Sequence, residues 1–460
     1  MSSSTEIISE DKQEHNDGTD SVQKSRNLGF VVRALKYRNY RLYFSGQSVS
    51  LIGTWMTRIA TSWLVYRVSG SAWLLGVVGF AGQVPSFLLG PLAGVWVDRW
   101  DRHRLLVVTQ VLAMLQSFAL AILALTNRIT MWEIIALSIF QGLINAFDMP
   151  GRQAFVVEMV ESREDLGNAI ALNSSMVNAA RLVGPSIAGV IIAATNEGWC
   201  FFIDGVSYLA VIASLLMMKL NNHGFTLAKD KKVWHQLREG FSYAAGFAPI
   251  KKILILLAVV SLVGMPYTVL MPIFASDVLH GGPNTLGLLM GASGVGALAG
   301  ALFLASRRTV LGMGKYIVVS AAAFGVGLIT FAYSHFLSLS LLLMLVTGGG
   351  FMVQMAVSNT ILQTIVDEDK RGRVMSFYTM AFMGTAPFGS LLAGMVADRI
   401  GAPATLAFGG VGCILGAIWF ATSLPALRQQ VRPIYRRMGI IPEVATGIQT
   451  ASELSVPPEK

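Results

Sequence analysis

Charged residues are scarce in this chain of 460 residues. Asp, Glu, Lys and Arg together make up 13% of it and hydrophobic residues 53%, with a mean hydropathy of +0.58. Soluble globular proteins carry about 25% charged residues, so half that share cannot cover the surface of several soluble domains. The composition therefore argues against a soluble enzyme, a nucleic-acid-binding protein and a disordered scaffold. It favours a polytopic membrane protein.

Cysteine and histidine are also rare, which excludes several kinds of chemistry. Cys200 and Cys413 lie far apart in apolar stretches, so we expect neither a disulfide framework nor a metal site. All six histidines fall in loops or tails, which argues against a histidine proton relay. No phosphate-binding glycine motif is present, so ATP drive and a bound cofactor are not expected. The first 29 residues are polar and acidic and do not resemble a secretory signal peptide.

Long apolar runs dominate the remainder of the chain. A helix needs about 20 mostly apolar residues to cross the hydrocarbon core of a bilayer. Twelve such runs are present, six on each side of a polar stretch, and they predict an all-α protein of twelve transmembrane helices. The runs cover residues 42–66, 73–97, 104–126, 131–149, 168–194 and 199–218, followed by 252–276, 285–305, 315–333, 336–358, 374–396 and 402–423.

The basic residues predict the orientation of these helices. With both termini cytoplasmic, 30 of the 35 Lys and Arg residues fall on the cytoplasmic side and three in outer loops, as the positive-inside rule expects. This bias accounts for the net charge of +9 without a nucleic-acid partner. We expect a cytoplasmic tail (1–40), a six-helix bundle (41–220), a linker with an amphipathic helix on the membrane surface (221–250), a second six-helix bundle (251–424) and a cytoplasmic tail (425–460).

A weak internal repeat supports two related halves. The segment from Arg152 to Ala169 follows the fourth span, and the segment from Ser358 to Val374 follows the tenth. Both contain a polar helix end, an apolar patch, an acidic cluster and a glycine before the next span. Paired halves of this kind build a midplane site that opens alternately to either side of the membrane.

Two glycine-containing strings resemble signatures of the major facilitator superfamily. Gly90-Pro-Leu-Ala-Gly94-Val-Trp-Val-Asp98-Arg99-Trp-Asp101-Arg102 joins the second and third spans and resembles the cytoplasmic loop signature. Gly184-Pro185-Ser-Ile-Ala-Gly189 on the fifth span resembles the antiporter signature. The resemblance implies the major facilitator fold of two six-helix pseudo-repeats, and the location of a multi-pass protein in the inner (plasma) membrane.

Further strings resemble the drug:proton antiporter branch, which includes enterobactin exporters and macrolide efflux proteins. They are Arg38-Asn-Tyr-Arg-Leu-Tyr-Phe, Gly53-Thr-Trp-Met, Trp63-Leu-Val-Tyr, Ala169-Ile-Ala-Leu-Asn-Ser and Arg371-Gly-Arg-Val-Met-Ser. The resemblance implies a proton-driven exporter of small amphipathic, drug- or siderophore-like molecules. We expect it to work by alternating access and as a monomer. On span four, members of this branch often carry an arginine that is linked to proton transfer. Ser138 stands at that position in this chain.

Other functions remain alternatives at this point. The same fold also serves uptake carriers and lysophospholipid flippases. A membrane enzyme or a receptor would need converging catalytic groups near one interface, and the sequence offers none.

The loop signature predicts a gate on the cytoplasmic side. Gly90 and Gly94 would let another helix approach closely. Asp98 would either face the positive N-terminus of span eleven or simply cap its own helix. Asp148, near the cytoplasmic end of span four, is expected to pair with Arg99 or Arg102; proton binding and helix capping are its alternatives. A similar string from Gly394 to Arg399 faces outward by this topology and is not expected to form the same gate.

Polar stripes on apolar helices predict a central cavity. Gln141, Asn145 and Asp148 share one face of span four, and Asn178 and Arg181 share one face of span five. Lining of a wet cavity is the favoured interpretation, and packing between helices is the alternative. Gly184, Pro185 and Gly189 predict a bend and close packing in span five.

Three ionisable residues lie towards the outer side of the membrane. Asp204 is the first choice for a proton carrier, because desolvation of a lone carboxylate favours its protonated form. An ion pair between Asp204 and Arg58 or Arg181 is the structural alternative. The two arginines would otherwise attract an anionic cargo, such as a catecholate or a carboxylate.

Overall fold

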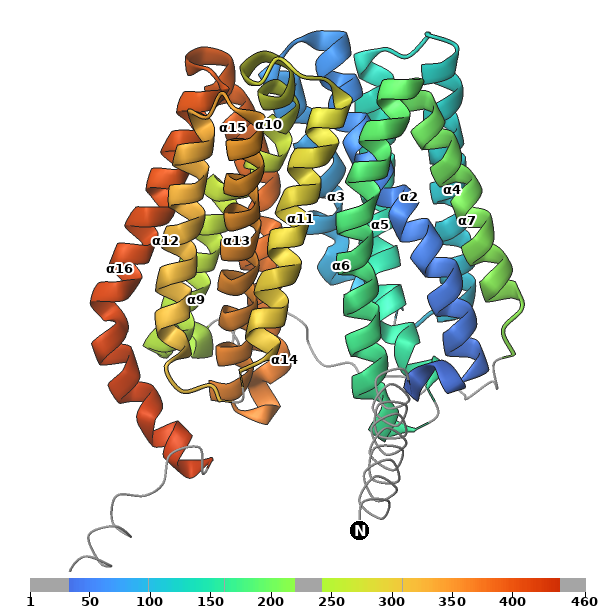
Figure 1. The fold of residues 1–460 in the computed structure, drawn as a ribbon. Coiled ribbons are helices and arrows are strands. Elements are labelled where there is room, and N and C mark those ends of the chain that lie inside the picture. Colours follow the sequence, from blue (N-terminus) through green and yellow to red (C-terminus); the bar gives the residue numbers. More distant parts are fainter. Residues whose placement is uncertain (1–32, 98, 161, 220–241, 308, 439–460) are drawn as a thin grey trace, which may run out of the picture.

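A computed structural model of the chain describes residues 33–97, 99–160, 162–219, 242–307 and 309–438. The regular elements in these ranges are helices, and most of them run side by side along the long axis of one bundle (Figure 1). Asp98 and the expected amphipathic helix around Trp234 lie outside the described residues.

The described residues of the N-terminal half form six long helices preceded by one short 3-10 helix. Capping residues begin several of them: Asp101 accepts a hydrogen bond from the backbone N–H of Arg104, and Thr130 and Glu133 form a reciprocal capping box. The elements are η1 (Arg33–Lys36), α2 (Arg38–Ser69), α3 (Ala72–Val97), α4 (Arg102–Leu125), α5 (Met131–Met159), α6 (Arg163–Ala194) and α7 (Glu197–Leu216).

The C-terminal half repeats the arrangement with two of its spans interrupted by wider π-helical segments. Span seven is interrupted twice and span eleven once, at or near Pro266, Pro272 and Pro387. The elements are α9 (Ala248–Val259), η2 (Val260–Gly264), α10 (Tyr267–Ile273), η3 (Phe274–Val278), α11 (Pro283–Ala305), α12 (Met313–Ala332), α13 (Leu337–Ile365), α14 (Glu368–Thr379), η4 (Met380–Gly384), α15 (Ala386–Ile400) and α16 (Ala402–Arg437).

Eleven spans in the described residues are long and apolar enough to cross a membrane. The first expected span, α2, is not among them, although its 32 residues are ample in length. Polar and charged side chains such as Gln47, Thr57 and Arg58 lower its hydropathy. It nevertheless packs against α6 and α7 within the bundle (Figure 1), so protein rather than lipid surrounds much of its surface.

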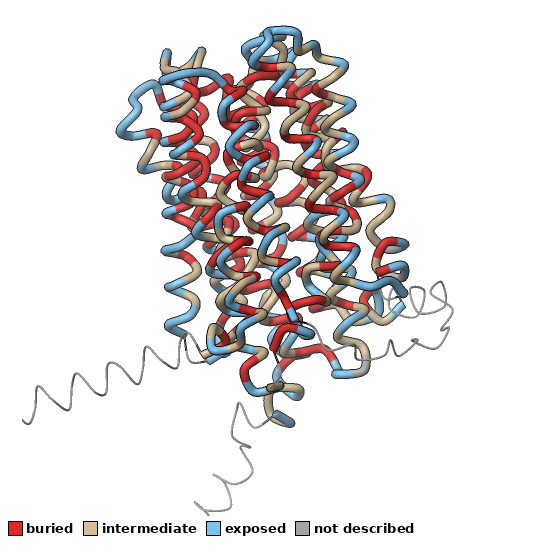
Figure 2. The backbone as a smooth tube through the Cα atoms, turned by 90° about the vertical axis from the view of Figure 1, so that its right-hand side faces the viewer, coloured by how far each residue is buried: buried red, intermediate tan, exposed pale blue. Residues whose placement is uncertain are grey.

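Buried and exposed residues alternate along most helices (Figure 2). Large apolar side chains are exposed on the bundle surface, including Trp132 at 79% and Leu216 at 65%. A helix with one packed face and one apolar outer face fits contact with lipid on its outer side.

Helix ends with many basic residues define one end of the bundle, which we call the basic end. It is the lower end in Figure 1, where α2 begins and α16 ends. The opposite end, where α3 and α11 begin, is called the outer end.

Both expected tails contain ordered helix next to the bundle. In the first, Lys36 of η1 lies 2.7 Å from Asp165 of α6, whose carboxylate raises the pKa of Lys36 above its ordinary value. In the second, the expected boundary at 424 falls inside α16, which continues to Arg437. Leu427 and Val431 are buried one turn apart, so packing against the bundle prolongs this helix beyond its apolar run.

Candidate transport site and gates

Asp204 lies inside the N-terminal half as a buried acid among hydroxyl groups. Its side chain is on α7, about 10 Å from the start of that helix at 1.5 Å per residue, and the residue is 1% exposed. One carboxylate oxygen accepts hydrogen bonds from Thr57 (2.7 Å) and Ser117 (2.9 Å). The other oxygen, Oδ1, has no hydrogen-bond partner among the described residues.

A glycine on α2 makes room for this carboxylate. A Cβ atom at Gly53 would lie 2.6 Å from Oδ1 of Asp204, closer than non-bonded atoms can pack. The Gly53-Thr-Trp-Met string thus brings the α2 backbone against Asp204. In the described part of the chain, Asp204 does not form an ion pair with Arg58 or Arg181, which was the structural alternative to a proton carrier.

Arg58 and Arg181 instead approach the same aromatic ring. The guanidinium carbon of Arg58 lies 5.0 Å from the ring centroid of Trp55, and that of Arg181 lies 5.8 Å from it. Both distances permit cation–π attraction. Arg58 is exposed although it lies within α2, and Arg181 is half-buried. Neither arginine forms an ion pair with an acid that the structure describes, so the cluster carries two uncompensated positive charges.

The antiporter-like string on α6 helps to position this cluster. A Cβ atom at Gly184 would lie 2.6 Å from the Cβ atom of Trp55, so the glycine allows the tryptophan to pack against α6. Pro185 lies inside the helix, and Gly189 faces α11 at the seam between the halves. Of the three residues expected to bend span five, Gly184 therefore faces α2, whereas Pro185 and Gly189 both lie against Gly287 of α11.

Asp148 forms a buried ion pair within its own helix. It is 1% exposed, and one oxygen accepts hydrogen bonds from Nε and Nη2 of Arg152. The other oxygen accepts hydrogen bonds from Thr109 (2.9 Å) and Gln110 (2.7 Å) of α4.

The expected pairing of Asp148 with Arg99 or Arg102 is therefore wrong. The fourth span was expected to end at residue 149, but α5 continues to Met159. Asp148 consequently lies about 16 Å from that helix end, at 1.5 Å per residue. Arg102 pairs instead with Glu158 at 2.6 Å, at the basic end.

The polar stripes on α5 and α6 remain partly accessible. Gln141 donates a hydrogen bond to Asn145 (3.1 Å) on α5, and Asn178 donates to the carbonyl of Ser174 (2.9 Å) on α6. Gln141, Asn145 and Asn178 are half-buried. The spacing in the sequence thus places the polar residues of each helix on one face of that helix. The hydrogen bonds that they form join residues of the same helix.

The two halves meet closely towards the outer end. A Cβ atom at Gly189 would lie 2.8 Å from the carbonyl oxygen of Pro283, where α6 crosses α11. A Cβ atom at Gly76 would lie 2.9 Å from the Cα atom of Gly394, where α3 crosses α15. Ser71 adds a hydrogen bond to Asp398 (3.4 Å).

The basic end of the same seam is different. Gly90 and Gly94 lie on α3, and a Cβ atom at either position would meet nothing within 4 Å. The close helix approach expected at these glycines is not made in this structure. The string from Gly394 to Arg399, not expected to form the same cytoplasmic gate, lies at the closed outer seam.

Several site residues were missed in the sequence. Thr57 and Ser117 bind Asp204, and Arg152 pairs with Asp148. A signal existed on span three, where Thr109 and Gln110 precede Gln116 and Ser117 by seven residues and so share one helix face. Thr57 and Trp55 carried no comparable signal, because neighbouring helices determine which α2 face meets Asp204 and the arginines.

Comparison with known proteins gives consistent relatives. Residues 33–449 match the model of the family described as transmembrane secretion effector. The chain is 27% identical over 384 residues to the staphyloferrin A transporter of Staphylococcus aureus (strain NCTC 8325 / PS 47), covering 83% of this chain and 95% of that protein. It is 28% identical over 388 residues to the multidrug efflux pump Tap of Mycolicibacterium fortuitum, covering 82% and 93%.

Two further comparisons extend these findings. Macrolide efflux protein A of Streptococcus pyogenes is 24% identical over 380 residues, covering 80% of this chain and 92% of that protein. Among solved structures, a bacterial homologue of the human lysosomal transporter Spinster, inward-facing and occupied, matches with a TM-score of 0.68 at 12% identity. It covers 85% of this chain and 97% of that chain. At this identity the structural match concerns the fold.

Proposed function

Because the chain belongs to the transmembrane secretion effector family of the major facilitator superfamily, we propose that it exports small amphipathic molecules in exchange for protons. Membership makes it a secondary transporter, a multi-pass protein of the bacterial plasma membrane, and not an enzyme. Export is the finer part of the proposal, and it is supported by relatives named as multidrug and macrolide efflux proteins.

The lone buried carboxylate of Asp204 carries the proton-coupling part of the proposal. An ionised group without a cationic partner is costly inside a protein, and a proton removes that cost. Thr57 and Ser117 bind one oxygen, whereas Oδ1 remains available to accept a proton. Asp148 is a weaker candidate, because Arg152, Thr109 and Gln110 already bind both of its oxygens.

The Arg58–Trp55–Arg181 cluster is the proposed cargo contact. Its aromatic face would stack against an apolar ring, and the two guanidinium groups would attract an anionic substituent. Gln141, Asn145 and Asn178 offer further hydrogen bonds from half-buried positions. This arrangement fits an amphipathic molecule that carries negative charge.

Alternating access would proceed by rocking of the two halves. In the proposed orientation the basic end is cytoplasmic. The two halves are then in contact on the outer side and are not in contact at Gly90 and Gly94 on the cytoplasmic side. Closing that contact while separating Gly76 from Gly394 would turn the site outward. One chain supplies both halves, and we propose that the working unit is a monomer.

The test is transport in membrane vesicles with an imposed pH gradient. Carboxyfluorescein and ethidium serve as an anionic and a cationic amphipathic probe. We expect inverted vesicles, acidic inside, to accumulate probe and release protons in step with it. Accumulation only in right-side-out vesicles, without a proton response, would contradict export and favour uptake or lipid flipping.

The matched variants for coupling are Asp204→Asn and Asp101→Asn. Asn at 204 keeps the hydrogen-bonding volume but cannot take up the proton, so we expect it to lose proton-linked transport. Asn at 101 keeps its role as helix cap and is expected to transport normally. Full proton-linked transport by Asp204→Asn would remove Asp204 from the mechanism.

A further inference from the structure

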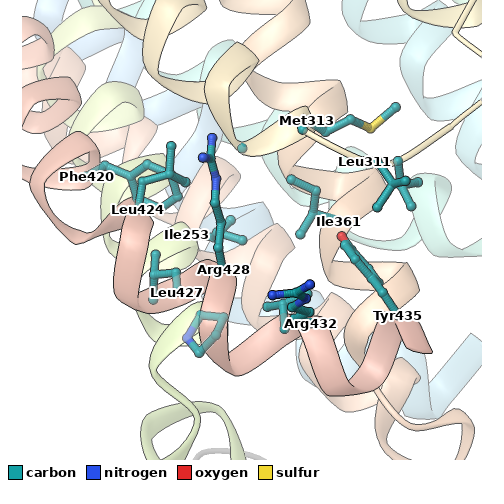
Figure 3. A pocket seen from close by; sticks show the side chains of 15 residues that line it. Ile253, Leu311, Met313, Ile361, Phe420, Leu424, Leu427, Arg428, Arg432 and Tyr435 are labelled. Carbon is teal, nitrogen blue, oxygen red and sulfur yellow. The ribbon is translucent and has the colours of Figure 1, made fainter. Parts of the chain in front are cut away.

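A pocket of about 220 Å³ lies at the basic end of the C-terminal half, away from the transport site. It is lined by residues of α9, of the segment before α12 and its first turn, of α13 and of the last turns of α16. Figure 3 shows the side chains that line it. It is smaller than the roughly 300–1,000 Å³ of a pocket for a drug-sized ligand, so it can hold only part of a larger molecule.

The pocket has an apolar floor and a positively charged rim. Ile253, Ile361 and Leu424 lie among the side chains of the floor. Arg428 and Arg432 lie on successive turns of α16 and both line the pocket, and Figure 3 shows the Arg428 side chain extending from the helix beside Leu424. Both arginines are exposed, and neither forms an ion pair with an acid that the structure describes. Two unpaired guanidinium groups above an apolar floor suit an amphiphile with an anionic head.

The position of the pocket identifies which amphiphile can reach it. The apolar run of the last span ends at residue 423, and α16 continues for a further 14 residues with four arginines. The rim therefore lies where the hydrocarbon core gives way to lipid headgroups. Basic pockets between transmembrane helices at this level are suited to acidic phospholipid headgroups.

We propose that this pocket binds an anionic phospholipid of the membrane. The lipid phosphate lies between Arg428 and Arg432, and part of one acyl chain covers Ile253, Ile361 and Leu424. The hydroxyl-bearing ring of Tyr435 borders the same opening (Figure 3). This lipid site is independent of the cargo and of the proton-coupling residue, because none of its lining residues belongs to the N-terminal half.

The experiment measures lipid retention by the purified full-length protein. Native mass spectrometry compares phosphatidylglycerol with phosphatidylcholine, and inorganic phosphate and glycerol 3-phosphate test for recognition of the head alone. We expect phosphatidylglycerol to be retained over phosphatidylcholine. The double variant Arg428→Gln/Arg432→Gln should bind it about tenfold more weakly, because two charge-assisted hydrogen bonds are lost.

A second double variant provides the matched control. Arg436→Gln/Arg437→Gln removes the same charge from the same helix outside the pocket lining, and we expect retention close to that of the unchanged protein. Leu311→Trp fills the pocket from an exposed position and should lower phosphatidylglycerol retention without removing charge.

Several outcomes would overturn the proposal. Equal losses in the two arginine pairs would show only general attraction to negative charge. Inorganic phosphate or glycerol 3-phosphate binding as well as the lipid would make the pocket a site for soluble phosphates. Retention that appears only after removal of residues 439–460 would show that the chain's own tail is the occupant.

Discussion

The two halves of this transporter share a helix plan but differ in what they bury. In the N-terminal half, Asp148 and Asp204 are each 1% exposed and lie within transmembrane helices. The buried polar residues described in the C-terminal half are all uncharged, and Gln354 of α13 is the largest of them. Among the described residues, the buried acidic side chains are therefore confined to the N-terminal half.

The C-terminal half differs in its backbone. Its spans seven and eleven contain the π-helical segments η2, η3 and η4, whereas the long helices described in the N-terminal half have none. Proline residues remove backbone donors close to these segments, and π-bulges relieve the resulting mismatch. Ser261 of η2 donates a hydrogen bond of 2.5 Å to the carbonyl of Phe382 in η4. The two irregular segments are thus joined side by side.

This difference suggests a division of labour between the halves. Buried charge is costly and needs rigid partners, which regular helices provide. Irregular helices have weakened backbone hydrogen bonding and are suited to bending. We infer that the N-terminal half carries the ion-dependent step and that spans seven and eleven absorb much of the shape change.

The largest expected effect comes from breaking the buried ion pair of the N-terminal half. Arg152→Ala leaves Asp148 buried without its cation, and we expect a loss of about 3–5 kcal/mol in stability. The comparison in the other half is Gln354→Leu, which replaces an amide with no hydrogen-bond partner among the described residues and should cost nothing or stabilise. Thermal unfolding of both variants in detergent measures the contrast; equal losses would refute it.

The next effect separates the two ends of the seam between the halves. Gly76→Ala forces a methyl group against α15 and should destabilise the present state by about 1–3 kcal/mol. Gly90→Ala meets open space here and should hinder only the opposite state. Ser174 is an exposed position on α6, and the rate of alkylation of Ser174→Cys measures access to the site. We expect this rate to fall when Gly76→Ala is added and to stay equal or rise when Gly90→Ala is added. A shift in the same direction for both would contradict the gating scheme.

A smaller effect concerns the Arg58–Trp55–Arg181 cluster, which gives the N-terminal half two positive charges within its helices, whereas the buried polar residues described in the C-terminal half are uncharged. Arg58→Gln/Arg181→Gln should lower carboxyfluorescein transport about tenfold, equivalent to about 1.4 kcal/mol, and leave ethidium transport unchanged. Arg128→Gln, an exposed arginine in the outer loop, is the charge-matched control for a single arginine. Equal losses for both probes would show a structural role for the arginines rather than recognition of an anion.

The smallest effect concerns the joined irregular segments. Ser261→Ala removes the hydrogen bond to Phe382 and should cost about 1 kcal/mol, the typical net value of one such bond. Ser62→Ala removes only a hydrogen bond to the carbonyl of Ile59 in its own helix, so we expect a smaller shift in the unfolding temperature. If the hydrogen bond between η2 and η4 contributes no stability, Ser261→Ala will lower the unfolding temperature no more than Ser62→Ala does.

Much of the fold could be predicted from local sequence. Eleven of the twelve expected spans coincide with apolar helical segments, because hydropathy over about 20 residues reports directly on membrane burial. The resemblance to the major facilitator superfamily is confirmed by the family match over residues 33–449. The end of α16 was missed, since its last turns are held by packing that hydropathy does not record.

The contacts between helices at the candidate site could not be predicted from the sequence. Spacing along one helix placed Gln141 with Asn145, and the apolar runs around Asp204, Arg58 and Arg181 singled these residues out as charges inside the membrane. Spacing could not select the partners of Asp204 or the Trp55 ring shared by the arginines. Those contacts depend on which faces of α2, α4, α6 and α7 meet.

By itself, the sequence determined the membrane-spanning helices, the two-half plan and the rarity of charge within it, because each follows from the local spacing of apolar and charged residues. Only the tertiary structure decided that Asp148 is buried against Thr109 and Gln110 of α4, that Asp204 has no cationic partner among the described residues, and that the outer rather than the basic end of the seam is closed. The physical reason is that a buried charge is stabilised by atoms from neighbouring helices. Their positions result from packing between segments distant in the chain.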